Sequence, residues 1–245
     1  MKIVVIIPSR YGSTRFMGKP LSPLKTKPMI QWVYETAKQV SSVNEVFVAT
    51  DDRRIVQAVE AFGGKAIMTG RANRSGTDRV GEAAATLGLN PEDIVVNIQG
   101  DQPAFNPLQI DQVVKPLLDE KDLGMSTLAF KIVDLKEITN PKDCKVTFDQ
   151  NGYALYFSRA PIPWDRDKTA VCDVYKHLGI YAYTKHFLDS FRRLPDGVLE
   201  NIEKLEQLRA LEYGHRIKVN ITPFDSPEVD VPADIARIEA LLPTP

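Results

Sequence analysis

The first hundred residues alternate between short apolar runs and amphipathic stretches of helix length, and this alternation constrains the fold more than any other feature. Short apolar runs bounded by polar residues are typical of buried strands, whereas apolar residues spaced three and four apart are typical of helices. Strands that alternate with helices form parallel sheets with helices on both faces. The expected strands are 2–8, 45–50, 65–68 and 93–99, and the expected helices are 29–40, 53–63 and 77–88.

From about residue 125 the pattern changes to strands with few helices between them, which predicts an antiparallel insertion over approximately 125–185. The chain of 245 residues has no repeat or long linker, so we expect a single domain, 1–245, that contains this lobe. The strands expected in the lobe are 125–133, 144–149, 153–158 and 178–184. The elements expected after it are helices 186–194 and 202–214, strand 216–222 and helix 231–242.

Charge and cysteine content exclude several classes of function. Lysine and arginine number 31 against 32 acidic residues, so the chain has no general attraction to nucleic acid or to anionic membranes. The opening apolar run is too short for a signal peptide or a spanning helix. Cys144 and Cys172 form neither a CxxC motif nor a metal-ligand set, which fits a reducing cytoplasm. We therefore expect a cytoplasmic protein without nucleic-acid or membrane partners.

The loop after the first strand, "SRYGSTRFMGKP", combines cations with glycines: Arg10, Gly12, Arg15, Gly18 and Lys19. Ligands of open parallel sheets bind beyond the carboxyl ends of the strands, where this loop lies. Glycines allow backbone N–H groups to approach an anion, and three cations neutralise it, so the loop predicts a triphosphate site. The loop is not a P-loop, because five residues separate its glycines and Pro20 follows the lysine. The predicted fold class is thus a nucleotide-binding α/β protein with a mostly parallel sheet, flanking helices and an inserted antiparallel lobe.

Two carboxylates are candidates for a magnesium site beside the phosphates. Asp101 follows the strand 93–99 in the segment "GDQP", and Asp230 ends an extended segment just before a helix that begins with proline. Mg²⁺ is typically held by one or two carboxylates together with phosphate oxygens. The alternative for either residue is a helix cap or a turn.

Six segments together resemble the 3-deoxy-manno-octulosonate cytidylyltransferase family, the CMP-Kdo synthetases of lipopolysaccharide biosynthesis. They are "IIPSRYGSTRFMGKPL", "SGTDR", "NIQGDQP", "YALYFSRAPIPWDRD", "KHLGIYAY" and "IEKLEQLRALEYG", in the family's order and nearly from end to end. The resemblance implies that CTP and Kdo give CMP-Kdo and pyrophosphate. It also implies a Mg²⁺ cofactor and a homodimer whose contact uses the inserted lobe.

The resemblance also assigns roles to individual residues. The nucleotide would be bound by Arg10, Gly12, Arg15, Lys19, Ser75, Gly76 and Arg79. The sugar acid would be bound by Gln99, Arg159, His177, either Tyr181 or Tyr183, Glu206 and Gln207. Lys19, Asp101 and Asp230 would be catalytic, with Asp101 and Asp230 as the magnesium ligands. Around Asp230 the sequence reads "PEVDVP", which departs from the family's usual "GVDTP".

Several alternatives remain at this point. The same reaction on 8-amino-3,8-dideoxy-manno-octulosonate differs from the main interpretation only in one substituent of the substrate, and a neuraminic acid is a further possible acceptor. A glycosyltransferase that uses a nucleotide sugar would not release pyrophosphate, and a nucleotide-binding module would bind CTP without turnover. His177 lies on an apolar strand, which favours a pocket wall over a general base.

Overall fold

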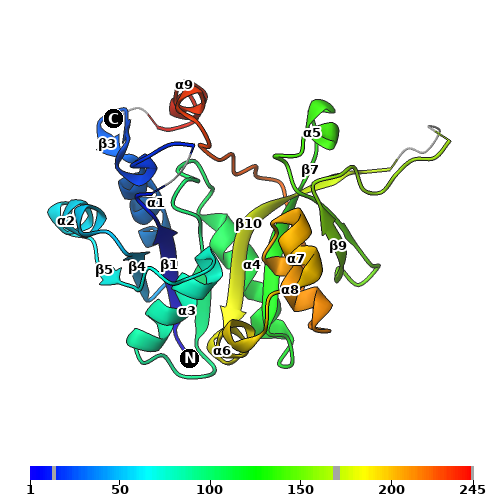
Figure 1. The fold of residues 1–245 in the computed structure, drawn as a ribbon, viewed down its shortest axis with the longest axis horizontal. Coiled ribbons are helices and arrows are strands. Elements are labelled where there is room, and N and C mark those ends of the chain that lie inside the picture. The colour runs from blue at the N-terminus through cyan, green and yellow to red at the C-terminus, as the bar shows by residue number, and fades with distance from the viewer. Residues whose placement is uncertain (13–14, 168–171, 244–245) are drawn as a thin grey trace.

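A single large sheet organises the computed structural model, which describes residues 1–12, 15–167 and 172–243 (Figure 1). The order of its strands is β11-β7-β10-β6-β1-β4-β5. Strands β1, β4, β5 and β6 are parallel, β7 and β11 are parallel to each other, and β10 runs antiparallel to its neighbours β6 and β7. The bounds of these strands are β1 (Ile3–Ser9), β4 (Glu45–Thr50), β5 (Ala66–Met68), β6 (Ile94–Asn97), β7 (Met125–Lys131), β10 (Tyr175–Thr184) and β11 (Lys218–Thr222). The predicted α/β class with a mostly parallel sheet is confirmed.

Two smaller antiparallel pairs complete the strands of the described chain. β8 (Lys145–Phe148) pairs with β9 (Ala154–Ser158) and with β10, and β2 (Pro23–Leu24) pairs with β3 (Lys27–Pro28). In Figure 1, β9 and α2 lie at opposite ends of the molecule. The segment 125–185 contains β7 and β10, which belong to the main sheet, as well as the β8–β9 pair. Its division from the rest as a separate lobe remains a prediction.

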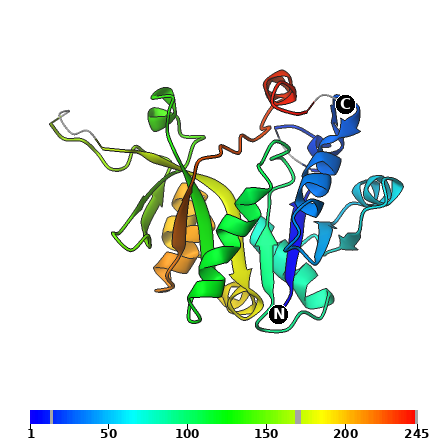
Figure 2. The same ribbon diagram turned by 180° about the vertical axis from the view of Figure 1, so that it is seen from behind.

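Helices cover both faces of the sheet, as the front and back views show (Figures 1 and 2). Their bounds are α1 (Met29–Lys38), α2 (Arg53–Ala61), α3 (Gly76–Thr86), α4 (Leu108–Asp119), α5 (Lys136–Thr139), α6 (Lys185–Arg193), α7 (Val198–Glu203), α8 (Gln207–Glu212) and α9 (Ile235–Glu239), with 3-10 turns at Lys19–Leu21 and Pro232–Asp234. Side-chain caps begin three of the helices. Asp52 caps α2, Ser75 caps α3 and Thr184 caps α6, each accepting a backbone N–H of the first turn.

The alternation of side chains along β1 divides the core into two parts. Val4 and Ile6 pack into the core beneath α3, α6 and α8, whereas Val5 and Ile7 pack into the core beneath α1, α2 and α4. All four side chains are fully buried. A strand that is buried on both faces has no polar side, which explains the uninterrupted apolar run at the start of the chain.

The helix expected over 202–214 is broken in the structure, so that prediction is wrong. Lys204 adopts a left-handed conformation with φ of 54°, which ends α7, and α8 begins at Gln207. Arg209 of α8 donates to the carboxylate of Glu200 in α7, with Nε 2.7 Å from Oε2, and this contact ties the two short helices together. Glu206 and Gln207 therefore lie at the start of α8 and not on one face of a long helix.

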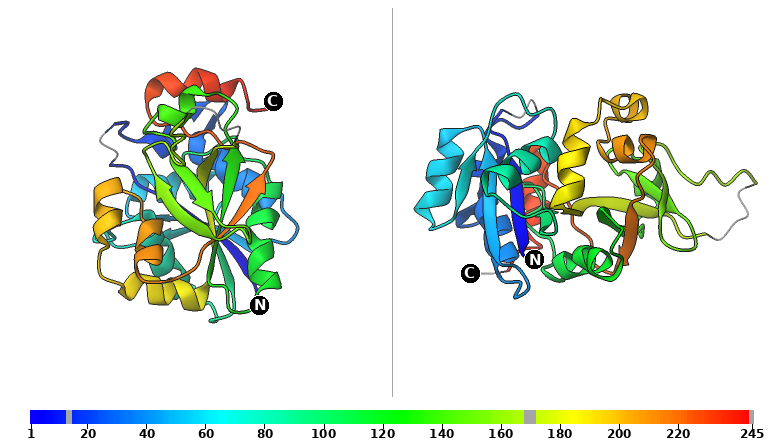
Figure 3. Two further views of the ribbon diagram at one scale, coloured as in Figure 1. Left: turned by 90° about the vertical axis from the view of Figure 1, so that its right-hand side faces the viewer. Right: turned by 90° about the horizontal axis from the view of Figure 1, so that it is seen from below.

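The C-terminal segment returns to the N-terminal part of the chain, as the end view shows (Figure 3). A small apolar cluster joins the two ends: Leu24, Met29, Trp32, Val229, Ile238 and Leu242. The backbone N–H of Val229 also donates to the carbonyl of Asp101 at 2.9 Å. These contacts place Asp230 beside Asp101, although the two residues are far apart in the sequence.

A substitution at Gly124 tests how tightly α6 packs on the start of β7. A Cβ atom at this position would lie 2.6–2.7 Å from the ring and Cβ of Phe187, which is buried in the core. We expect Gly124→Ala to lower the free energy of unfolding by about 1–3 kcal/mol, because the overpacked helix must shift. Gly70→Ala is the control, since its nearest neighbour would be at 3.6 Å. Equal urea midpoints for the two variants would contradict this packing.

Candidate active site

The loops that follow β1 and β6 meet at the carboxyl edge of the sheet. A Cβ atom on Gly100 would lie 2.5 Å from Oγ of Ser9, so only glycine allows this approach of the β6 loop to the end of β1. Gly76, at the start of α3, lies beside Pro8, Gln99 and Glu206, at 3.6–3.8 Å from where its Cβ would be. The first turn of α3 is thus part of the same crevice.

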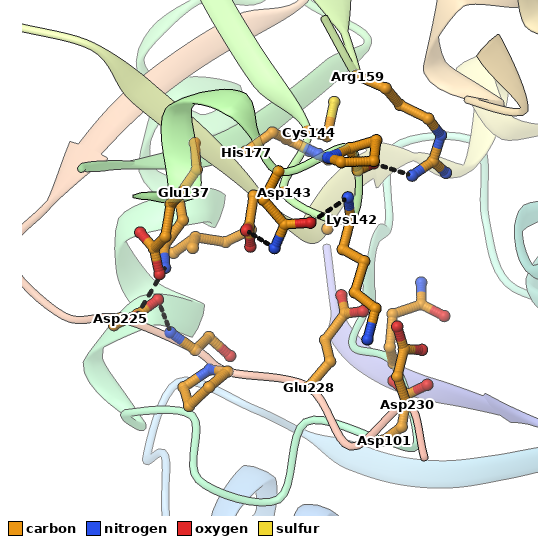
Figure 4. Close-up of a pocket in the computed structure, with 18 of the residues that line it drawn as sticks. Asp101, Glu137, Lys142, Asp143, Cys144, Arg159, His177, Asp225, Glu228 and Asp230 are labelled. Carbon is orange, nitrogen blue, oxygen red and sulfur yellow. Dashed lines mark hydrogen bonds and ion pairs between the residues drawn. The ribbon is translucent and has the colours of Figure 1, made fainter. Parts of the chain in front are cut away.

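Next to this crevice lies a cavity of about 1050 Å³ (Figure 4), large enough for a sugar and part of a nucleotide. The predicted site residues that line it are Arg15, Gln99, Asp101, Arg159, His177, Tyr181, Glu206, Gln207 and Asp230. The predicted residues that are not in its lining are Arg10, Gly12, Lys19, Ser75, Gly76, Arg79 and Tyr183. The structure therefore gathers most of the expected sugar-binding residues around one space.

Two cations of the first loop pair with the two candidate metal ligands. Nζ of Lys19 lies 2.5 Å from Oδ2 of Asp101, and Nη1 of Arg15 lies 3.0 Å from Oδ2 of Asp230. The second oxygen of Asp101, Oδ1, is buried and has no hydrogen-bond partner among the described residues. A buried carboxylate oxygen without a partner is unfavourable by itself and suits a cation or a donor brought by a ligand.

Glu228 is a third carboxylate at this end of the cavity, and it was not predicted. Its side chain is exposed and lines the cavity, and Figure 4 shows it close to Asp101 and Asp230. The protein atoms around the cavity desolvate this carboxyl group and raise the pKa of Glu228 to about 8, aided by the negative charges of Asp101 and Asp230 and opposed by Lys19. The sequence did contain one clue, because Glu228 belongs to the segment "PEVDVP", which departs from the family's usual "GVDTP".

Replacement of Glu228 by glutamine should change how stability depends on pH. The native protein holds the proton on Glu228 up to about pH 8, whereas the unfolded chain releases it near pH 4.5. The native state therefore binds more protons in this range, and its free energy of unfolding falls as pH rises through it. Glutamine does not ionise, so we expect Glu228→Gln to have a higher melting temperature than the native protein at pH 8.5 and a similar one at pH 4.5.

The measurement is thermal unfolding at both pH values without added magnesium. Glu92→Gln, at an exposed position, is the matched control and should follow the native protein throughout. A Glu228→Gln variant whose melting temperature runs parallel to the native one at every pH would contradict the raised pKa.

Arg159 forms a cationic wall opposite these carboxylates. Its guanidinium donates to three backbone carbonyls, with Nε 2.7 Å from O of Glu203, Nη1 2.9 Å from O of Pro141 and Nη2 3.4 Å from O of Lys204. No carboxylate of the described chain forms an ion pair with it. The guanidinium is therefore held in place while its charge is available to a carboxylate in the cavity.

Tyr181, Gln207 and His177 add neutral polar groups to the cavity wall, and Glu206 adds a carboxylate. The hydroxyl of Tyr181 donates to Oε1 of Gln207 at 3.0 Å, and burial raises the pKa of Tyr181, so the phenol stays protonated. Burial lowers the pKa of His177 to about 3, so its imidazole is neutral at physiological pH. The carboxylate of Glu206 accepts the backbone N–H of Thr77 at 3.2 Å, which links α8 to the first turn of α3.

Arg10 organises the entrance to α3. Its Nη2 lies 2.7 Å from the carbonyl of Asn73 and 3.3 Å from that of Ser75. Oγ of Ser75 in turn accepts the N–H of Asp78 at 3.1 Å and caps the helix. Gly12 is exposed in the first loop and has open space where a side chain would be. Two N–H groups of this first turn, those of Thr77 and Asp78, thus have partners within the protein, and Arg10 lies beside them as the cation of this part of the site.

Arg79 and Tyr183 lie deeper than expected for residues that touch a ligand. The Arg79 side chain is fully buried, with Nη1 2.5 Å from Oγ1 of Thr69 and Nη2 3.2 Å from Oδ2 of Asp51. Burial lowers the pKa of Arg79, and the charge of Asp51 opposes that shift. The Tyr183 hydroxyl contacts Oγ1 of Thr77 at 3.2 Å. Arg79 therefore anchors α3, of which it is part, to Thr69 and Asp51, and Tyr183 of β10 supports the first turn of the same helix.

The fold and this site together define the class of protein to which the chain belongs. A mostly parallel α/β sheet with a cationic, glycine-containing loop and carboxylates at its carboxyl edge is the arrangement of a nucleotidyltransferase. The cytidylyltransferase family model matches residues 4–217, and the chain belongs to that family. Within the described residues, no helix is both long and apolar enough to cross a bilayer.

Individual relatives resemble the chain over nearly its whole length. A 3-deoxy-manno-octulosonate cytidylyltransferase of Desulfosudis oleivorans is 65% identical over 242 residues, which cover 99% of this chain and 98% of the relative. An 8-amino-3,8-dideoxy-manno-octulosonate cytidylyltransferase of Shewanella frigidimarina is 55% identical and covers 99% of both chains. A solved CMP:2-keto-3-deoxy-manno-octonic acid synthetase in complex with CTP superposes with a TM-score of 0.92 at 43% identity, over 98% of each chain.

Proposed function

We propose that this protein transfers CMP from CTP to 3-deoxy-manno-octulosonate, giving CMP-Kdo and pyrophosphate for lipopolysaccharide biosynthesis. The observation that carries the proposal is the placement of Arg159 across one cavity from the pairs Lys19–Asp101 and Arg15–Asp230. A sugar carboxylate fits the guanidinium of Arg159, and a polyphosphate fits the cations of the first loop. The relative at 65% identity carries the name of this activity.

In this mechanism the anomeric hydroxyl of Kdo attacks the α-phosphorus of CTP in line. The new P–O bond forms as the bond to pyrophosphate breaks, and the hydroxyl proton passes to solvent. Lys19, Arg10 and Arg15 stabilise the charge that develops on pyrophosphate, while Arg159 fixes the sugar carboxylate and so orients the hydroxyl. The reaction depends on position and charge, so it needs no strong side-chain base.

Asp101 and Asp230 would hold a magnesium ion in the same site. The unpartnered Oδ1 of Asp101 and the hard oxygen donors of both residues fit Mg²⁺. No group of three or more histidine, cysteine or acidic side chains in the described chain forms a complete metal site, so phosphate oxygens would complete the coordination. When bound, the ion would lower the pKa of the attacking hydroxyl and neutralise phosphate charge.

A homodimer in the cytoplasm is the proposed state of the protein. Leu155 on β9 and Trp164 in the following segment are exposed apolar side chains of the proposed lobe, which suits an interface there. Sedimentation velocity of the native protein tests this part, and a monomer at micromolar concentration would contradict it.

Comparison of acceptors separates the proposal from its nearest alternative. Purified protein with CTP and Mg²⁺ would be given Kdo, 8-amino-3,8-dideoxy-manno-octulosonate or N-acetylneuraminate, and kcat/KM would be measured from pyrophosphate release. We expect Kdo to have the highest value. A preference for the amino sugar would favour the activity named for the relatives at 55% identity, and no release with any acceptor would overturn the proposal.

A further inference from the structure

An irregularity in β10 lies at the wall of the cavity. His177 pairs with Ala129 of β7, and Tyr181 pairs with Thr127. Between these two pairs β10 takes four residue steps and the antiparallel strand β7 takes only two, so β10 bulges. Gly179, inside this bulge, has φ of 67°, which other residues rarely adopt. Bulges of this kind redirect backbone and side-chain groups beside active sites. Here the bulge directs the carbonyl of Ile180 toward a side chain of β7.

The side chain that receives this carbonyl belongs to Thr127. Oγ1 of Thr127 lies 2.7 Å from O of Ile180 and 2.8 Å from Nε2 of His177. The carbonyl oxygen of Ile180 can only accept a hydrogen bond, so the threonine hydroxyl must donate its single hydrogen to it. The hydroxyl can then only accept from the imidazole. Nε2 of His177 must therefore carry a proton.

The other ring nitrogen of His177 is consequently a free acceptor. Burial lowers the pKa of His177 to about 3, so the ring is neutral and Nδ1 carries no proton. In the described parts of the chain Nδ1 has no hydrogen-bond partner, and it is not among the buried unpaired atoms. His177 lines the cavity beside Cys144 and Arg159 (Figure 4). A nitrogen of such low basicity is suited to accept a hydrogen bond and unsuited to remove a proton.

We propose that Thr127 is a positioning residue, which fixes His177 as the Nε2–H tautomer so that Nδ1 accepts a hydrogen bond from a hydroxyl of the sugar acid. The identity of the ligand rests on the proposed function, but the tautomer does not. Nothing in the sequence motifs points to Thr127, because its contact depends on the bulge in the neighbouring strand.

Nitrogen NMR of protein labelled with ¹⁵N-histidine tests the tautomer directly. The chain has three histidines, so the His177 signals can be assigned with a His177→Asn variant. We expect a protonated Nε2 and an unprotonated Nδ1 in the native protein. Thr127→Ser, which keeps the hydroxyl, should retain this pattern, and Thr127→Val should lose it. A proton on Nδ1 in the native protein would overturn the proposal whatever the enzyme's activity, as would an unchanged tautomer in Thr127→Val.

Steady-state kinetics tests the ligand. We expect Thr127→Val to raise KM for the sugar acid by about tenfold, the effect of one weakened hydrogen bond, with KM for CTP unchanged. Thr222→Val is the matched control, because it removes a buried threonine hydroxyl on β11 outside the cavity lining. An altered tautomer with an unchanged sugar KM would overturn the role of Nδ1. If no sugar acid is turned over by the native protein, the proposed function fails while the NMR result still decides the tautomer.

Discussion

Replacement of Asp101 by asparagine is expected to lower turnover with CTP and Kdo by on the order of a hundredfold or more, the typical effect of removing a charge-stabilising group. The change removes the charge that pairs with Lys19 at 2.5 Å and the oxygen proposed to bind Mg²⁺. Asparagine has nearly the same shape, so the fold should persist. The measurement is kcat at saturating substrates, with circular dichroism to verify folding.

Asp119→Asn on α4 is the matched control for this variant. Asp119 is exposed, and among the described residues its ion-pair partner is Lys115, one turn earlier in the same helix. We expect its kcat to equal that of the native protein. If Asp101→Asn also retained near-normal turnover, the assignment of Asp101 as a metal ligand would be wrong.

Replacement of Arg159 should affect the sugar acid and not the nucleotide. The guanidinium is fixed by three backbone carbonyls, so it can meet a carboxylate without reorganisation. Loss of a charge-assisted hydrogen bond costs about 1.5–3 kcal/mol, so we expect Arg159→Met to lower kcat/KM for Kdo by about ten- to a hundredfold. KM for CTP should stay within about twofold of the native value, which is the size of change expected for a substitution that does not touch the nucleotide.

Two further variants sharpen this test. Arg159→Lys should recover little activity, because an ammonium cannot bind a carboxylate with two parallel bonds or keep the backbone contacts. Arg193→Met, at the end of α6, removes an arginine outside the cavity lining and should behave as the native protein. Equal losses for Kdo and CTP in Arg159→Met would show that Arg159 supports the whole site rather than the sugar-acid subsite.

The parallel part of the central sheet was predictable because its strands β1, β4 and β6 are buried on both faces. Their apolar runs are uninterrupted and the helices between them carry clear patterns, so β1, β4, β5 and β6 were each found near their true bounds. Helix α4 was not among the predicted segments; it contains Pro116 in its interior, a residue that usually ends a helix pattern.

The break between α7 and α8 illustrates a different limit. Local composition from Ile202 to Gly214 is that of a good helix, but Lys204 adopts a left-handed conformation and Arg209 folds back onto Glu200. Tertiary contacts therefore decide the path of the chain there, and propensity alone could not have revealed it. The antiparallel place of β10 between β6 and β7 has the same origin, since register depends on partners far away in the sequence.

The candidate site was predictable where a motif carried it. Asp101 and Asp230 were found from their place after extended segments, and the structure places them in one cavity with Arg15 and Arg159. Glu228 was missed because its importance comes from two neighbouring carboxylates, which only the fold brings together. Thr127 was missed for a similar reason, because the bulge in β10 directs both of its partners toward it.

The most direct test of the central claim is ³¹P NMR of a reaction that contains purified protein, CTP, Mg²⁺ and Kdo. The account predicts that CTP signals are replaced by equal amounts of a single CMP-sugar phosphodiester and pyrophosphate, and that neither product forms when the sugar acid is left out. Unchanged CTP, or CMP and phosphate without a phosphodiester to the sugar, would contradict it.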